Sequence, residues 1–147
     1  MSDLRDLYQE VILDHNKRPR NFRIIEQATH HADGVNPLCG DRVSVFLDVQ
    51  DGVIKDIAFQ GAGCAISSAS ASLMTEALKG KSVVEVEHLF EAFHNVVTGE
   101  CDCPKGLGKL GVLAGVRDYP SRVKCATLAW HAVRAALQEH QQPVATE

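Results

Sequence analysis

Apolar residues recur at helical spacing in four stretches of the chain, separated by glycine, proline and polar residues. Residues three and four positions apart share one face of a helix, so this periodicity predicts amphipathic helices. They span residues 3–15, 65–79, 86–97 and 121–138. Local end signals support these bounds: Pro19 prevents extension of the first helix, Gly80 ends the second, and Ser82 with Glu85 forms a capping-box pattern before the third.

A different period marks residues 42–50, where apolar and polar side chains alternate as in a half-buried strand. Asp51-Gly52 follows, and residues 54–59 then return, which is the pattern of a β-hairpin. An edge strand is expected near residues 29–32, a loop over 99–111, a short helical turn over 112–116 and a frayed, disordered tail over 141–147. The chain lacks βαβ alternation, so we predict an α+β fold: a small antiparallel sheet of about three strands with helices packed on it.

Composition narrows the class of protein. The 147 residues suit one domain, and 45% of them are hydrophobic, enough for a core. A net charge of −4 leaves no basic surplus for phosphates, which argues against nucleic acid as a partner. The sequence also shows neither a membrane-length apolar run nor a secretory signal. We therefore expect a cytoplasmic protein, in which cysteines serve metal binding or chemistry more often than disulfides.

Three of the five cysteines stand in distinctive local settings. Cys39 and Asp41 flank Gly40 in a turn-rich segment before a strand, so that one loop presents two anionic groups. Cys64 follows Gly61 and Gly63 and directly precedes a helix, and Cys125 is expected in about the first turn of the last helix. Helix N-termini favour the thiolate, which is the form that binds metal and attacks sulfur.

Three thiolates and one carboxylate, from Cys39, Asp41, Cys64 and Cys125, complete a tetrahedral shell that suits Zn²⁺. The softness of sulfur also permits iron. The competing interpretation is that these cysteines are small buried hydrophobes, since the chain has no Cys-x-x-Cys pair. The glycine-framed loops favour the metal site, because a purely structural cysteine needs no such framing.

The motifs around these residues resemble those of the SufU/IscU family of iron–sulfur cluster assembly proteins. The resemblance covers nearly the whole chain and includes an opening segment and three cysteine motifs. These are Leu7-Tyr8 with Asp14-His15-Asn16-Lys17-Arg18-Pro19-Arg20-Asn21, then Asn36-Pro37-Leu38-Cys39-Gly40-Asp41, Gly61-Ala62-Gly63-Cys64-Ala65-Ile66-Ser67 and Arg122-Val123-Lys124-Cys125-Ala126-Thr127-Leu128. The family fold, a small antiparallel sheet covered by helices, agrees with the pattern analysis.

Three departures make the chain similar to the SufU branch. Lys124 stands where IscU proteins usually have a histidine, residues 119–123 replace the chaperone-recruiting segment, and the stretch between Cys64 and Cys125 is longer. This resemblance implies a zinc-dependent sulfur acceptor rather than an independent turnover enzyme, served by a SufS-like pyridoxal-phosphate cysteine desulfurase and followed by downstream cluster assembly proteins. It also implies that docking frees Cys39 to take the persulfide sulfur while Asp41, Cys64 and Cys125 hold the zinc.

Two alternatives use the same ligands: a scaffold on which a [2Fe–2S] cluster is assembled and then transferred, and a structural zinc module that mediates protein contacts. Cys101 and Cys103 depart from the family pattern. They are interpreted as incidental surface cysteines, with sulfur relay or a second metal site as the alternative.

Overall fold

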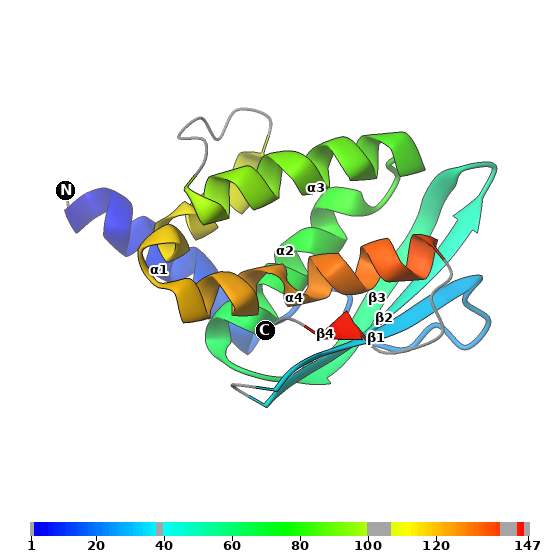
Figure 1. The fold of residues 1–147 in the computed structure, drawn as a ribbon, viewed down its shortest axis with the longest axis horizontal. Helices are drawn as coiled ribbons and strands as arrows, with labels where there is room; N and C mark the ends of the chain where they lie inside the picture. Colours follow the sequence, from blue (N-terminus) through cyan, green and yellow to red (C-terminus); the bar gives the residue numbers. More distant parts are fainter. Residues whose placement is uncertain (1, 38–39, 100–106, 139–143, 146–147) are drawn as a thin grey trace.

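The computed structural model describes residues 2–37, 40–99, 107–138 and 144–145 and has an α+β fold, as predicted. Its helices are α1 (Ser2–Lys17), α2 (Ala65–Leu78), α3 (Val83–Thr98), the 3₁₀ segment η1 (Gly108–Asp118) and α4 (Pro120–Leu137). Its strands are β1 (His30–Asn36), β2 (Asp41–Gln50), β3 (Val53–Ala62) and β4 (Val144–Ala145). The helices lie on one face of the sheet (Figure 1). Among the described residues, no helix combines the length and apolar character needed to span a membrane.

The sheet has the order β3-β2-β1-β4, with antiparallel pairing between β1, β2 and β3. The predicted hairpin is confirmed: Asp51 and Gly52 join β2 to β3 with φ angles of 55° and 75°. Both angles lie in the left-handed region that tight hairpin turns require. Strand β1 is longer than the edge strand expected from the sequence, and β4, inside the expected tail, pairs with it in parallel. The rest of that tail, apart from Val144–Ala145, lies outside the described residues.

The segment η1 differs from the prediction, because it begins inside the expected loop and is longer than the expected turn. Leu107, Leu110, Leu113 and Val116 are all buried and recur every third residue. A 3₁₀ helix has three residues per turn, so this spacing places all four side chains on one face. The turn expected over residues 112–116 lies within η1, but the 3.6-residue and two-residue periods do not reveal the element's full length.

Helices α2 and α4 contact the sheet, and α3 packs on α4 and η1. A buried polar bridge links α2 to α4: the Ser70 hydroxyl donates to the Ala126 carbonyl and accepts from the indole N–H of Trp130 at 3.2 Å. Trp130, the single tryptophan of the chain, also stacks on Phe93 of α3 with ring centroids 4.5 Å apart. Ser70 therefore fixes the relative position of the two helices that carry Cys64 and Cys125.

Replacing Ser70 by alanine should lower the free energy of unfolding by about 1–3 kcal/mol, because the buried indole N–H of Trp130 loses its acceptor. Urea unfolding followed by Trp130 fluorescence measures this loss. Ser121→Ala, at an exposed position near the start of α4, is the matched control and should change stability little. Equal stability of the Ser70→Ala and Ser121→Ala proteins would contradict the bridge.

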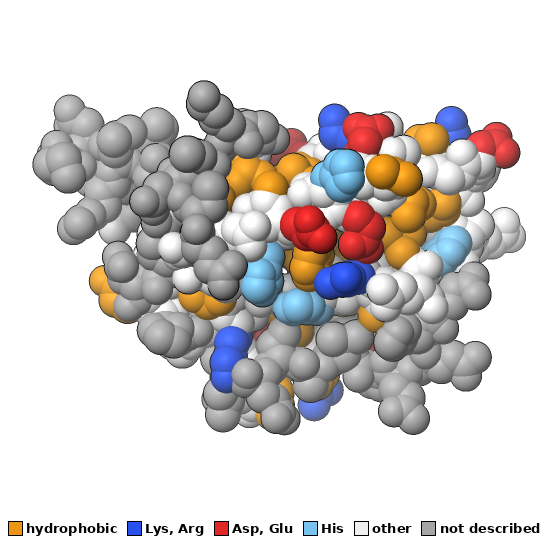
Figure 2. All heavy atoms as spheres, turned by 45° about the horizontal axis from the view of Figure 1, so that its top comes forward, with side chains coloured by type: hydrophobic (Ala, Val, Ile, Leu, Met, Phe, Trp, Pro, Cys, Tyr) orange, Lys and Arg blue, Asp and Glu red, His pale blue; other side chains and the backbone are white. Residues whose placement is uncertain are grey.

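Charged and titratable side chains gather over α3 and α4 (Figure 2). His131 packs beside the Phe90 ring, at a centroid distance of 5.4 Å, and the His94 ring, at 6.4 Å. Burial, together with the positive charges of His94 and Arg134, lowers the pKa of His131 below its usual range. The folded protein therefore favours a neutral imidazole at this position.

This shift predicts a pH-dependent stability. The unfolded chain titrates His131 near its usual pKa of about 6.5. Because the folded pKa is lower, the unfolded state binds more protons, and stability is lost as the pH falls below that value. The free energy of unfolding, measured in urea between pH 7.5 and 5, should fall less in His131→Gln than in the wild type. The exposed His88→Gln is the control and should keep the wild-type slope; a wild-type slope in His131→Gln as well would refute the role of His131.

Candidate metal centre

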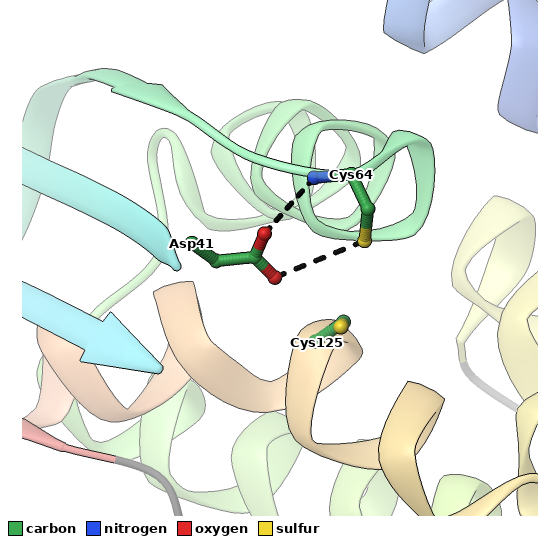
Figure 3. Close-up of side chains that lie close together, drawn as sticks. All are labelled: Asp41, Cys64 and Cys125. Atoms are coloured by element: carbon green, nitrogen blue, oxygen red, sulfur yellow. Dashed lines mark hydrogen bonds between the residues drawn. The ribbon is translucent and has the colours of Figure 1, made fainter. Parts of the chain in front are cut away.

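Asp41, Cys64 and Cys125 come from distant parts of the chain and meet at one place (Figure 3). Asp41 is the first residue of β2, Cys64 directly precedes α2 and Cys125 belongs to α4. One carboxylate oxygen and the two sulfurs all lie within 4.8 Å of one another. The structure therefore brings together three of the four ligands that the sequence predicts.

The Asp41 carboxylate is buried, with 2% of its residue surface exposed. Its Oδ1 accepts a hydrogen bond of 3.0 Å from the backbone N–H of Cys64, and its Oδ2 lies 3.8 Å from the Cys64 sulfur. One oxygen is thus held by the start of α2, while the other faces the sulfur (Figure 3). A carboxylate fixed in this way offers one oxygen to a shared ion.

Cys64 is the N-cap residue of α2. Its φ and ψ angles of −71° and 169° are extended, and its sulfur accepts a hydrogen bond of 3.4 Å from the N–H of Ser67. The sulfur therefore takes the part that a serine oxygen usually plays at a cap, at the positive end of the helix dipole. The prediction that Cys64 lies at a helix N-terminus is confirmed. Sequence analysis missed Ser67 as a partner, although three residues is the usual spacing from an N-cap to its donor.

Cys125 lies slightly later in α4 than its expected place in about the first turn. Pro120 begins α4, which suits proline because the first helical N–H has no partner within the helix. Cys125 is then the sixth residue of α4 and lies in its second turn. The helix dipole acts mainly within the first turn. Burial beside Asp41 and Cys64, rather than a helix end, therefore defines the surroundings of this sulfur.

Cys39, the fourth predicted ligand, lies outside the described residues, so its ligation stays a prediction. The described Gly40, its neighbour in the sequence, has a φ of 74°, and its N–H donates to the Asn36 carbonyl at 2.8 Å. Gly40 thus adopts the unusual backbone angle expected for the glycine of this motif. Cys101 and Cys103 also lie outside the described residues.

The donor atoms of Asp41, Cys64 and Cys125 are of the kinds that bind transition metals. Sulfur atoms from cysteine combined with one carboxylate oxygen suit Zn²⁺ and also accept iron. Cysteine binds metal as the thiolate, so the described residues alone bring up to three negative charges into a mainly buried position. Charges of one sign are costly to bury without a counter-ion. A bound cation is the direct way to neutralise them.

Comparison with known proteins agrees with this geometry. Residues 7–146 match the model of the NifU-like N terminal domain. The chain is 43% identical to the iron–sulfur cluster assembly scaffold protein IscU of Streptococcus pyogenes serotype M1, covering 94% of this chain and 87% of the relative. It is 38% identical to the zinc-dependent sulfurtransferase SufU of Bacillus subtilis (strain 168), covering 95% of each.

A solved structure also has the same fold. It belongs to a protein proposed as an iron–sulfur cluster assembly scaffold of the SUF system in Fervidobacterium islandicum AW-1. The TM-score is 0.83 at 34% identity, and the match covers 87% of this chain and 94% of the other. Together with the site geometry, these matches show that the chain belongs to the NifU-like N-terminal domain family, which includes the iron–sulfur cluster assembly proteins IscU and SufU.

Proposed function

We propose that this protein is a zinc-dependent sulfur acceptor in iron–sulfur cluster assembly. The observation that carries the proposal is the convergence of Asp41, Cys64 and Cys125, whose donor atoms lie within 4.8 Å of one another. The similarity to a relative named zinc-dependent sulfurtransferase supports the sulfur-transfer role. In this proposal the ligands are Cys39, Asp41, Cys64 and Cys125, and the sulfur donor is a SufS-like pyridoxal-phosphate cysteine desulfurase.

Cys39 is the proposed acceptor. Its thiolate attacks the terminal sulfur of a persulfide on the desulfurase, so that a new S–S bond forms on Cys39 as the old one breaks. The desulfurase cysteine leaves as a thiolate, and the exchange therefore balances in charge and in electrons. Bound zinc supplies a positive charge that keeps the cysteine ligands deprotonated at neutral pH.

The residues other than Cys39 hold the site together during this exchange. Asp41 and Cys64 are tied to the start of α2 by backbone hydrogen bonds, and Cys125 is fixed within α4. Both hydrogen bonds join residues other than Cys39. The site can therefore keep its shape while Cys39 reacts.

The second candidate function is a scaffold on which a [2Fe–2S] cluster is built and from which it is transferred. It is supported by the relative from Streptococcus pyogenes, which is named a scaffold protein. Thiolates and a carboxylate bind iron as well as zinc. Freshly purified protein separates the two functions: a colourless, zinc-containing sample supports the acceptor, and a brown sample with iron–sulfur absorption supports the scaffold.

The ligand assignment predicts how single variants bind zinc. Cys64→Ser, Cys125→Ser and Asp41→Ala should each weaken zinc binding at least tenfold. Losing even a residue that only hydrogen-bonds a metal ligand typically lowers metal affinity tenfold to a hundredfold. Competition with a chromophoric chelator measures the affinity. Cys101→Ser and Cys103→Ser are the controls and should bind as the wild type does. Unchanged affinity in the three ligand variants would refute the metal centre, and weakened binding in either control would instead implicate the 101–103 segment.

The acceptor role predicts a dependence of desulfurase turnover on this protein. Zinc-loaded wild-type protein should increase the rate of alanine release from cysteine by the desulfurase, and metal-stripped protein should not. Cys39→Ser should abolish the increase because serine cannot carry a persulfide, while leaving the thermal unfolding of the fold largely intact. Full stimulation by Cys39→Ser would overturn the assignment of Cys39 as the acceptor. A wild-type protein that binds zinc but leaves turnover unchanged would overturn the acceptor function.

A further inference from the structure

Gly63 lies directly against the Asp41 carboxylate. A Cβ atom added to Gly63 would lie 2.7 Å from Asp41 Oδ1 and 3.0 Å from its Cγ. Real Cβ contacts essentially never fall below 3.0 Å, so a side chain at residue 63 and the present position of the carboxylate exclude each other. The three nearest atoms to this Cβ all belong to the side chain of Asp41.

Neither the backbone conformation nor the burial of Gly63 requires a glycine. Its φ lies outside the left-handed region, so an alanine can adopt the same backbone conformation. The position is exposed to solvent, so an added methyl group would not disturb the core. Gly61 is different, because a Cβ there would lie 2.2 Å from the Arg42 carbonyl oxygen in the paired strand β2. Gly61 thus serves the sheet, whereas the three nearest atoms to a Cβ at residue 63, among the described residues, all belong to Asp41.

We propose that Gly63 is a positioning residue for the metal ligand Asp41. Its missing side chain lets the carboxylate reach the N–H of Cys64, which holds Oδ1 at 3.0 Å. The other oxygen, Oδ2, then faces the Cys64 sulfur (Figure 3). Gly63 thereby makes Asp41 a ligand with a single oxygen available. This inference rests on the proposed metal site. Gly63 would set the position of the Asp41 carboxylate in that site without itself contacting the metal.

A double-mutant cycle on metal affinity tests the proposal. The proteins are wild type, Gly63→Ala, Asp41→Ala and the double variant, and zinc affinity is measured by chelator competition. Gly63→Ala should weaken zinc binding about tenfold or more when Asp41 is present, the loss typical of an outer-shell residue. In the Asp41→Ala background, Gly63→Ala should change zinc affinity less than twofold. The two atoms that lie closer than 3.3 Å to the added Cβ, Oδ1 and Cγ of Asp41, are absent from that variant. Gly115→Ala, where an added Cβ meets nothing within 4 Å, is the control and should bind as the wild type does.

Cobalt substitution gives a second measurement. Co²⁺-loaded Gly63→Ala should keep its sulfur-to-cobalt charge-transfer absorption, because the cysteine ligands are unchanged. Its ligand-field bands should shift toward those of Asp41→Ala, because both variants lose the carboxylate from its place. Bands identical to those of the wild type would refute the displacement of Asp41.

Each remaining outcome decides the proposal. Equal weakening by Gly63→Ala in both backgrounds would overturn it, since Gly63 would then act on the fold and not through Asp41. If Gly63→Ala does not fold, the double variant should recover folding by circular dichroism, and an unfolded double variant would refute the proposal. A wild-type protein that binds no zinc would instead remove the metal site itself, which separates that failure from a failure of the Gly63 assignment.

Discussion

The structure depends on one constraint, a carboxylate buried beside two cysteine sulfurs. Asp41 and Cys125 each expose only 2% of their surface. Desolvating anionic groups is expensive, and placing several together adds repulsion. The Cys64 N–H offsets part of this cost at Asp41, and the start of the α2 helix dipole offsets part at Cys64. A cation bound among the three groups, as proposed, would complete the compensation and would couple metal binding to folding.

The fold meets this constraint by bringing three elements to one point. Strand β2 begins with Asp41, and the end of β3 leads through Gly63 to the cap of α2. Helix α4 supplies Cys125, and the bridge from Ser70 to Ala126 and Trp130 holds α4 against α2. Ala126, whose carbonyl accepts from Ser70, directly follows Cys125 in α4. A shift of α4 relative to α2 would therefore change the position of the Cys125 sulfur relative to the Cys64 sulfur. The buried polar network therefore supports the proposed metal centre as well as the core.

Much of this arrangement follows from local sequence signals. Asp51-Gly52 predicts the hairpin because its backbone angles suit few other residues, and Ser82 with Glu85 predicts the start of α3. The position of Cys64 directly before a helix follows from the glycines that precede it and the helical periodicity that comes after it. Cys125 was expected in about the first turn of α4, but it is the sixth residue of the helix and lies in the second turn. Only part of η1 was predicted, because its apolar residues recur at a period of three. The contact between Gly63 and Asp41 joins residues 22 positions apart, so no local pattern encodes it.

The elements that carry the proposed ligands suggest how one site could bind a metal firmly and still react. Asp41, Cys64 and Cys125 belong to a strand, a helix cap and a helix, and backbone hydrogen bonds fix the first two. The proposed fourth ligand, Cys39, belongs in the sequence to the short connection between β1 and β2. Ligands on regular elements are held more rigidly than ligands on connections. If Cys39 ligates as proposed, the cysteine that accepts sulfur is also the ligand that can leave at least cost to the others.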